Sequence, residues 1–376
     1  MSKQIAFVIH QLGGIGAGGV DRVASLLANE FAERGWQVDI LVMSSNTLIE
    51  RDLSKEITVR FEAPSRSNAG FIQNVQRILR GVGLVRNYAK EHPDAVIVSF
   101  IHWINVCTVL GVTGIKHGPV ILSERTDPAS DPAHRIARRI RDVGYGRADA
   151  LVFQTLDAQK YFSRIRDVEC AVIANPVSPG LPAWKQPPPG HVEIVTAARL
   201  EEEKNLPMLI DAFRPIAIER PDARLRIYGK GRVHDSLQRQ IDEAGLADSV
   251  KLEGFARDVH ERMSTASMFV LSSNFEGLPN ALLEAMSMGM PVISTDCPIG
   301  GPRMLIDDGV NGLLVPVDDA EAMSAQMQKL VHDEEEARRL GAAAAQSRER
   351  YSSARIADSW ESFIRALQGS AAKAAR

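Results

Sequence analysis

Short apolar runs alternate along the chain with longer segments whose apolar residues repeat at helical spacing. The run IAFVIH (5–10) precedes VDRVASLLANEFAERG (20–35), where Val23 and Leu27 share one helical face, and QVDILVM (37–43) follows. Further strands of the first half are predicted at 95–100, 119–123, 150–154 and 171–174. This alternation is typical of βαβ units and predicts a mostly parallel sheet with helices on both faces.

The segment NPVSPGLPAWKQPPPG (175–190) interrupts this alternation, because six prolines and two glycines exclude a helix or a central strand. We interpret it as an interdomain linker. The alternation then resumes, with strands predicted at 193–200, 223–231, 250–255, 267–273, 290–295 and 312–317. The chain therefore predicts an α/β protein with two tandem doubly wound domains, at 1–180 and 190–350. Such sheets bind ligands beyond the carboxyl ends of their strands, so we expect a site in an interdomain cleft.

Composition narrows the class of protein. The 376 residues are 45% hydrophobic and 24% charged, as in soluble globular proteins. A net charge of −3 argues against a nucleic-acid partner. Three scattered cysteines and a polar start without a secretory signal predict a cytoplasmic, reducing location. Residues 95–115 lack charge over the length of a membrane span, but their polar residues favour a buried strand and helix over a transmembrane helix.

The stretch GGIGAGG (13–19) matches the dinucleotide pattern G-x-G-x-x-G between a first strand and a first helix. A dinucleotide site also needs an acidic residue at the end of the second strand, whereas this strand ends at Met43 and Asp39 lies inside it. A nicotinamide or flavin site, a flexible turn, and a loop whose amides face a polar ligand all stay open, with the last favoured. Asp21 caps the following helix in any of these.

The stretch NFEGLPNALLEAMSMGMPVIS (274–294) places two carboxylates where a strand runs into a helix. Glu276 lies in the turn, Pro279 suits the first helical position, and Glu284 is more than one turn inside the helix. The free amides of 277–281 and the helix dipole predict an anion site. The alternative is that Glu276 only caps the helix and Glu284 is solvated.

Two cations precede this stretch in AARLEEEKNLPMLIDAF (197–213). Arg199 ends a strand and Lys204 precedes a helix, so both are positioned to reach a pyrophosphate near residue 278. The alternative is surface pairing with the acidic residues 201–203. A further strand-to-loop turn, YGKGR, carries Gly229 and Gly231, which let the backbone approach a ligand.

These motifs together resemble the retaining family-4 glycosyltransferases, which have the GT-B fold. The resemblance rests on FEGLPNALLEAMSMGMPVIS as E-x7-E, ARLEEEKN, IYGKG, VKLEGF and DDGVNGLLVP, and it covers nearly the whole chain. It implies that the second domain binds a nucleotide-diphosphate sugar and that the first binds the acceptor. It also implies that a C-terminal helix near 352–370 packs back on the first domain through Trp360 and Phe363.

The resemblance implies a role for each matching residue. Arg199, Lys204 and Glu276 are the catalytic candidates, the two cations on the diphosphate and the carboxylate on the donor sugar. Glu284 meets the ribose, and Phe255 lies near the base. The remaining donor-binding candidates are Gly18, Gly19, Gly229, Gly231, Gly277, Leu278, Pro279 and Asn280. No D-x-D motif is found, so we expect a metal-independent enzyme without a cofactor, in which these cations stabilise the leaving diphosphate.

The sequence departs from the family pattern in the first domain. Many members place a sugar-contacting His after the strand near 120, but this chain has Glu124 and Arg125 there, and its glycine loop continues to Asp21 instead of Glu. The nearest other histidine is His102. These four residues are the candidates for contact with the acceptor or the sugar, although a core role is the alternative for His102.

The segment HRIARRIRDVGYGR (134–147) predicts an amphipathic basic helix. Ile136, Ile140 and Val143 share one face, and the arginines are Arg135, Arg138, Arg139, Arg141 and Arg147. Such a helix suits an anionic membrane or a lipid-linked diphosphate, with RILRGVGLVR (77–86) adding to it. The alternative is a solvated basic face packed on its own sheet. We expect an acceptor on a lipid carrier and a peripheral location on the inner face of the plasma membrane.

The reaction predicted from the resemblance is transfer of a hexosyl or N-acetylhexosaminyl unit, with retention, in cell-surface polysaccharide or glycan biosynthesis. A UDP-sugar is the favoured donor and a GDP-sugar the rival. The alternatives are a sugar-nucleotide 2-epimerase of similar fold, a non-catalytic nucleotide-sugar sensor and a dehydrogenase. The sequence leaves open the sugar, the base, the linkage and the oligomeric state.

Overall fold

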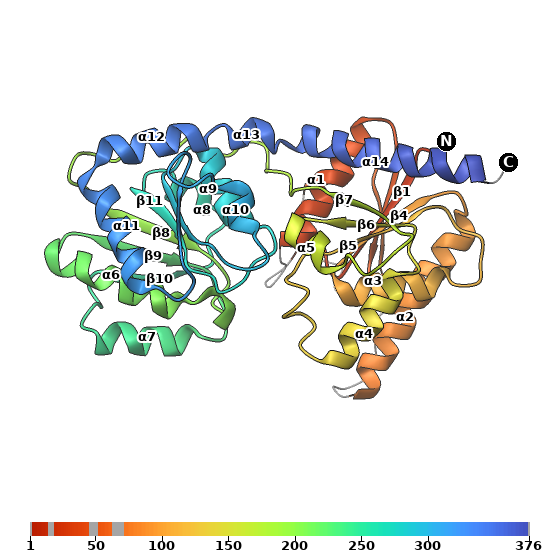
Figure 1. Ribbon diagram of the computed structural model, residues 1–376, viewed down its shortest axis with the longest axis horizontal. Coiled ribbons are helices and arrows are strands. Elements are labelled where there is room, and N and C mark those ends of the chain that lie inside the picture. Colours follow the sequence, from red (N-terminus) through yellow and green to blue (C-terminus); the bar gives the residue numbers. More distant parts are fainter. Residues whose placement is uncertain (1, 14–18, 45–51, 62–70, 375–376) are drawn as a thin grey trace. The chain divides into compact units, whose positions relative to one another are not determined.

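The chain folds into two compact α/β units. The computed structural model describes residues 2–13, 19–44, 52–61 and 71–374. Unit 1 contains Met1–Pro176 together with Ser353–Arg376, and unit 2 contains Val177–Ser352 (Figure 1). Each described unit is built on a wholly parallel sheet with helices on both faces, as the alternating pattern predicts.

The sheet of unit 1 has, within the described residues, seven strands in the order β3-β2-β1-β4-β5-β6-β7. Its strands are β1 (Gln4–Ile9), β2 (Gln37–Val42), β3 (Thr58–Phe61), β4 (Val96–Phe100), β5 (Val120–Ser123), β6 (Ala150–Phe153) and β7 (Glu169–Val172). The central strands are buried along almost their full length, which explains why they read as continuous apolar runs. The two edge strands are half-exposed.

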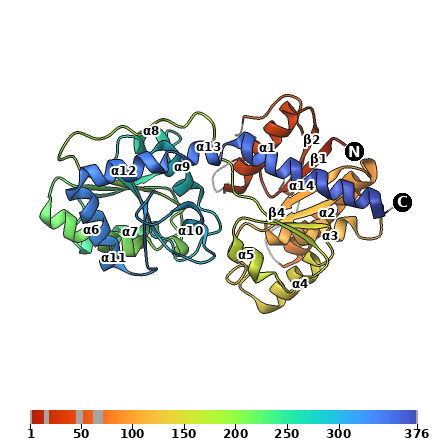
Figure 2. The ribbon, with the colours of Figure 1, turned by 45° about the horizontal axis from the view of Figure 1, so that its top comes forward.

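The helices of unit 1 cover both faces of this sheet. They are α1 (Gly19–Glu33), α2 (Phe71–Glu91), α3 (His102–Val112), α4 (Arg135–Tyr145), α5 (Leu156–Tyr161) and α14 (Ser353–Ala374). Figures 1 and 2 show α14 alongside α1, and α2, α3 and α4 as neighbours on the opposite face, where α3 packs between the other two. Residues 95–115 therefore form a buried strand and helix. None of the described helices combines the length and the apolar character that a membrane span requires.

Helix α14 joins the end of the chain to unit 1. Trp360 is fully buried, with its ring edge against Phe100 at 6.4 Å between centroids. Glu361 accepts a hydrogen bond from the indole nitrogen of Trp36 at 3.2 Å. Phe363, which we expected to dock beside Trp360, is only half-buried, and Ile364 occupies the buried position instead. Helix α14 thus packs on unit 1 through a stripe of buried side chains centred on Trp360.

The sheet of unit 2 repeats the same topology, with the order β10-β9-β8-β11-β12-β13 in the described residues. Its strands are β8 (Glu193–Ala197), β9 (Arg224–Tyr228), β10 (Val250–Gly254), β11 (Met268–Leu271), β12 (Val292–Thr295) and β13 (Leu313–Val315). Its helices are η1 (Glu202–Lys204), α6 (Leu206–Glu219), α7 (His234–Glu243), α8 (Val259–Met263), α9 (Asn280–Met288), α10 (Gly301–Leu305), α11 (Ala320–His332), α12 (Glu334–Ala344) and α13 (Ser347–Arg350). The strand order reverses between β8 and β11, and ligands of doubly wound sheets bind at such a switch point.

The proline-rich segment is not a free linker. The chain divides at Pro176, and the residues after this proline pack on unit 2. The amide of Trp184 donates to the carbonyl of Met288 at 2.7 Å, and its indole nitrogen donates to Ala266 at 2.7 Å. Prolines exclude regular structure here, but hydrogen bonds from the residues between them fix the segment in place.

Candidate functional site

The carboxyl edge of the second sheet gathers the charged residues that the sequence singled out. Arg199 follows β8, Lys204 ends η1, and Glu276 lies in the loop between β11 and α9. These positions flank the switch point of unit 2. The parallel sheet brings them together because every strand delivers its following loop to the same edge.

Lys204 and Glu276 form the central pair of this edge. Nζ of Lys204 donates to Oε1 of Glu276 at 2.6 Å, and both side chains are mostly buried, with 14% and 13% exposed. The hydroxyl of Ser273 donates to the same carboxylate oxygen at 2.7 Å. Sequence reasoning missed Ser273, since a serine at a strand end carries no distinctive signal. The pair keeps a cation and a carboxylate fixed at the switch point.

Arg199 lies nearer to solvent. Its side chain is 61% exposed, and Nη2 donates to Oε1 of Glu203 at 2.9 Å. The surface-pairing alternative therefore describes Arg199 correctly in this structure, but not Lys204, whose partner is Glu276. An exposed pair of this kind contributes little to stability, so an anionic ligand can displace Glu203 at small cost.

The loop from Glu276 to Pro279 leads into α9 with its geometry fixed by a second loop. The amide of Glu276 donates to Pro298 at 2.9 Å, and Ile299 donates back to Glu276 at 3.3 Å. Gly301 permits this approach, because a Cβ there would lie 1.8 Å from the carbonyl oxygen of Gly277. Leu278 is buried in the turn.

Helix α9 begins one residue later than predicted. Pro279 has an extended backbone and occupies the N-cap, so Asn280 is the first helical residue. Pro279 still belongs to the turn, because its backbone is extended and not helical. Pro279 offers no side-chain cap, and the first amides of a helix lack intrahelical acceptors. The helix start therefore suits an anion.

Glu284 is buried rather than solvated, which corrects the alternative interpretation of this residue. Its Oε2 lies 2.9 Å from Nε2 of His260, in α8. The predicted core positions Leu282, Leu283 and Met286 are buried as well. A histidine 24 residues upstream has no recognisable spacing to Glu284, so nothing in the sequence indicated this pair.

Backbone packing explains why glycine occupies positions 229 and 231, a reason that the sequence interpretation missed. A Cβ on Gly229 would lie 1.8 Å from the carbonyl oxygen of Ala198, and one on Gly231 would lie 2.1 Å from that of Leu200. The loops after β8 and β9 touch through their backbones, so glycine is needed here without any ligand. Phe255, after β10, exposes 64% of its surface, as an open stacking surface would.

The glycine loop of unit 1 is only partly described. Gly18 lies outside the described residues, and Gly19 is the first residue of α1. Asp21 is buried, and Oδ2 accepts a hydrogen bond from the amide of Gly13 at 3.2 Å. Asp21 thus links the end of β1 to the start of α1.

Glu124 and Arg125 are both buried after β5, unlike surface ligand contacts. Oε2 of Glu124 accepts from the phenol of Tyr145 at 2.7 Å, and Oε1 accepts from the amide of Arg125 at 2.9 Å. Arg125 donates to Oδ1 of Asn175 and stacks on Phe100 at 4.8 Å. Burial lowers the pKa of Arg125 to about 9, against the opposing charge of Glu124.

His102 begins α3 and is partly exposed. Its Nδ1 lies 3.3 Å from Oδ2 of Asp131 without the angle of a hydrogen bond. Burial alone would raise the pKa of Asp131, but His102 and nearby donors lower it. The ring of His102 is thus mostly but not fully buried and meets a carboxylate at the carboxyl edge of the first sheet, and its contact with an acceptor or sugar stays a prediction.

The basic helix α4 differs from its sequence interpretation at two arginines, Arg141 and Arg138. Arg141, predicted to face a membrane, is fully buried and donates to the carbonyls of Pro128 and Asp131 at 2.8 and 3.0 Å. These carbonyls turn toward the helix, and a guanidinium satisfies both. Arg138 is half-buried and donates to two carbonyls of the preceding loop. Arg135 and Arg139 are exposed as predicted.

Two family models divide the chain between them. The model described as Glycosyltransferase Family 4 matches residues 17–181, and the model described as Glycosyl transferases group 1 matches residues 184–347. This chain belongs to the family-4 glycosyltransferases. The two models together cover most of both described units.

The names of three curated relatives of this chain refer to exopolysaccharide, peptide and lipopolysaccharide. An exopolysaccharide phosphotransferase of Streptomyces coelicolor is 34% identical over 46% of this chain and 18% of the relative. The UDP-N-acetylglucosamine–peptide N-acetylglucosaminyltransferase GtfA subunit of Streptococcus gordonii is 28% identical over 68% of this chain and 53% of the relative. The lipopolysaccharide core biosynthesis glycosyltransferase LpsE of Rhizobium meliloti is 24% identical over 84% of this chain and 86% of the relative. The chain thus spans about half or less of the first two relatives.

Solved structures agree on the fold. Sucrose-phosphate synthase from Thermosynechococcus elongatus has a TM-score of 0.83 at 20% identity, over 98% of this chain and 99% of that one. Anabaena HepE with UDP-glucose has a TM-score of 0.78 at 17% identity, over 96% and 99%. Staphylococcus aureus TarM with UDP has a TM-score of 0.78 at 14% identity, over 96% and 99%. These likenesses show the GT-B fold.

Proposed function

We propose that this glycosyltransferase moves a hexosyl or N-acetylhexosaminyl unit from a UDP-sugar to a glycan acceptor, with retention, in polysaccharide or glycan biosynthesis. The observation that carries the proposal is the Lys204–Glu276 pair at the switch point of unit 2, beside the start of α9. The UDP in the TarM structure and the UDP-glucose in the HepE structure support the choice of donor.

The two cations stabilise the leaving diphosphate. In the described structure each is held by a carboxylate, Lys204 by Glu276 and Arg199 by Glu203. A bound diphosphate attracts both cations, and the amides at the start of α9 add dipoles aimed at the same charge. Groups already oriented toward the developing charge lower the barrier most, because they need no reorganisation as the bond breaks.

The proposed reaction transfers one glycosyl group and one proton. The bond between the anomeric carbon and the β-phosphate oxygen breaks, and its electron pair stays on the phosphate. The acceptor oxygen bonds to the anomeric carbon on the same face, and its proton passes to the leaving phosphate. Glu276 contacts the donor sugar once Lys204 turns to the phosphates, and Glu284 holds the ribose.

The acceptor is proposed to be a glycan on a lipid carrier, bound by unit 1. Asp21, His102, Glu124 and Arg125 all lie at the carboxyl edge of the first sheet. His102 is the strongest candidate for contact with the sugar or acceptor, because its ring is partly exposed whereas Glu124 and Arg125 are buried. The lipopolysaccharide glycosyltransferase LpsE among the relatives supports such an acceptor.

The test is donor turnover followed by NMR, with UDP-glucose and UDP-N-acetylglucosamine in EDTA. We expect slow release of UDP and an α-configured sugar, without a second sugar nucleotide. A product of inverted configuration would contradict retention. Complete dependence on a divalent ion would contradict a metal-independent reaction. A new sugar nucleotide made from donor alone would indicate the epimerase, which none of the comparisons supports.

A further inference from the structure

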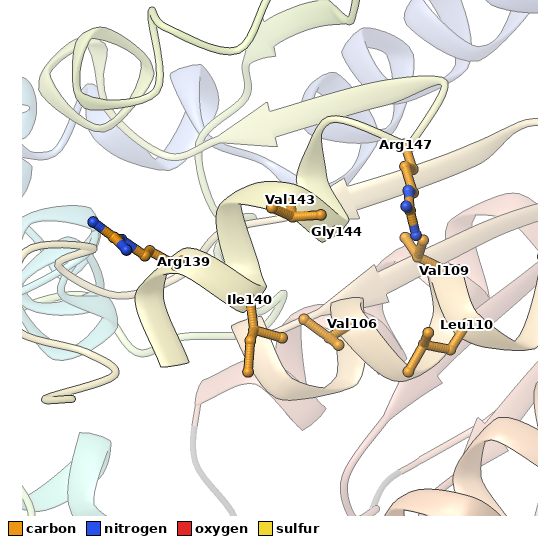
Figure 3. A pocket seen from close by; sticks show the side chains of 8 residues that line it. All are labelled: Val106, Val109, Leu110, Arg139, Ile140, Val143, Gly144 and Arg147. Carbon is orange, nitrogen blue, oxygen red and sulfur yellow. The ribbon is translucent and has the colours of Figure 1, made fainter. Parts of the chain in front are cut away.

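A surface groove lies between α3 and α4 of unit 1. It has a volume of about 280 Å³ and is lined mainly by apolar side chains. Figure 3 shows Ile140 of α4 beside Val106 of α3, with Arg139 and Arg147 toward opposite ends of α4. The groove is therefore mainly apolar, with arginines at its margins.

Exposed apolar side chains concentrate around this groove. Ile136, Ile140 and Val143 are 75%, 55% and 60% exposed and follow one another at helical spacing, and Leu110 of α3 is 44% exposed. Of the eleven large apolar side chains exposed in the described residues, these four all lie on α3 and α4. A gathered patch, unlike scattered exposed residues, marks an interaction surface. We call Leu110, Ile136, Ile140, Val143 and the groove the α3–α4 face.

The charge around the α3–α4 face is positive. Arg135, Arg139 and Arg147 are exposed, and α3 contains no charged residue. The one acidic residue of α4, Asp142, lies 2.9 Å from the guanidinium of the buried Arg141. A second copy of this chain would bring the same arginines together, which like-charge repulsion opposes. A partner with an anionic surface and an apolar interior fits both the exposed apolar side chains and the positive charge.

We infer that the α3–α4 face docks on an anionic lipid bilayer, with Ile136, Ile140 and Val143 entering the hydrocarbon boundary. The groove receives part of an acyl chain, and Arg135, Arg139 and Arg147 contact anionic headgroups. This inference takes its biological purpose from the proposed lipid-linked acceptor. Lipid binding itself is measured without sugar chemistry, so the two can fail separately.

The experiment is co-sedimentation of the full chain with vesicles of phosphatidylcholine, with or without phosphatidylglycerol. We expect binding that needs the anionic lipid and weakens with salt. Replacing both Arg139 and Arg147 by Gln should lower the partition coefficient about 25-fold, since each arginine near such a surface contributes about fivefold. The matched control replaces Arg164 and Arg166, which are also exposed on unit 1, and should change it much less.

The apolar contribution has its own matched pair. Ile136→Ser should weaken binding about fourfold or more, because each buried methylene contributes about fourfold. Ile218→Ser, at an isoleucine 72% exposed on α6, should leave binding unchanged. Both side chains are exposed, so both variants should fold, which the unfolding temperature checks.

Three outcomes would overturn the inference: equal binding to neutral vesicles, equal losses in test and control variants, or lipid-free self-association that Ile140→Ser abolishes. The last result would assign the face to a second copy. The response of the unfolding temperature to UDP, measured on the same preparations, separates the two proposals. A UDP response without lipid binding contradicts only the docking, and lipid binding without a UDP response contradicts only the donor site.

Discussion

The two units share a topology but treat the charges at the carboxyl edges of their sheets differently. In unit 2, Lys204 and Glu276 pair with each other in a mostly buried contact at the sheet edge, and Arg199 is largely exposed. In unit 1, Glu124 and Arg125 are buried, and Glu124 is surrounded by hydrogen-bond donors. The same fold therefore presents replaceable pairs on one sheet and an enclosed network on the other.

This difference separates charges that serve a ligand from charges that serve the fold. A bound diphosphate can replace Glu203 beside Arg199 and Glu276 beside Lys204, because each cation is paired with a single carboxylate. Removing a buried charge in unit 1 instead changes the stability of the folded chain, since its partners cannot turn to water. Three substitutions test this contrast, in order of expected effect.

The largest effect is expected at Arg199. Arg199→Ala should lower kcat for donor turnover by roughly 10²–10³, on the order of 3–4 kcal/mol, as for the loss of one preorganised donor. The unfolding temperature should stay the same, because an exposed ion pair contributes little. Arg339→Ala is the control, since Arg339 is also exposed and paired with a nearby glutamate, Glu336. Wild-type turnover by Arg199→Ala would remove Arg199 from the catalytic residues.

The second effect is loss of stability at Arg141. Arg141→Met should destabilise unit 1 by about 2–4 kcal/mol, because the carbonyls of Pro128 and Asp131 lose a charged donor. Arg139→Met, at an exposed position of the same helix, should change stability by less than about 0.5 kcal/mol. Scanning calorimetry measures both. Equal stabilities would mean that Arg141 is not part of the fold's internal network.

The smallest effect, and one of opposite sign, is expected at Arg125. Within the described residues, its Nε and Nη2 are buried and make no hydrogen bond. Burial disfavours this charge more than Glu124 offsets, so Arg125→Met should stabilise the protein at pH 7 by about 1 kcal/mol. Asn175 keeps a donor, since Gln154 also bonds to its Oδ1 at 2.6 Å.

The pH dependence sharpens the prediction at Arg125. Burial lowers its pKa in the folded chain to about 9, below that of the unfolded chain, so folding releases a proton between these two values. Wild-type stability then rises with pH above about 9, and the advantage of Arg125→Met should shrink there. A variant that is less stable at pH 7 would show that the guanidinium is satisfied in the folded chain.

Much of the fold could be predicted because buried parallel strands are continuous apolar runs. The edge strand β3 escaped detection, since its residues are half-exposed and lack that run. Predicted strands such as 193–200 extend past the true end of β8 at Ala197, where the chain turns toward Arg199. Periodicity reports burial and not where a sheet stops, so the ends of elements were least predictable.

The candidate site was predictable only where local spacing determines position. The E-x7-E spacing places Glu276 in a turn and Glu284 on the following helix, which the structure has. Partners distant in sequence, such as His260 beside Glu284, depend on tertiary packing and leave no local signal. The prediction was wrong at Arg141. A basic amphipathic helix is typical of an exposed surface, and the sequence does not indicate that a loop carbonyl accepts a hydrogen bond from this arginine.

The most direct test is the unfolding temperature with UDP in the presence of EDTA. We predict that UDP stabilises the wild type, by about 2.7 kcal/mol at a hundredfold excess over Kd. Lys204→Met should abolish that response, whereas Lys329→Met, which breaks another lysine–glutamate pair of unit 2, should keep it. A wild type that ignores UDP, or a Lys204→Met variant that responds equally, would contradict diphosphate binding at the switch point of unit 2.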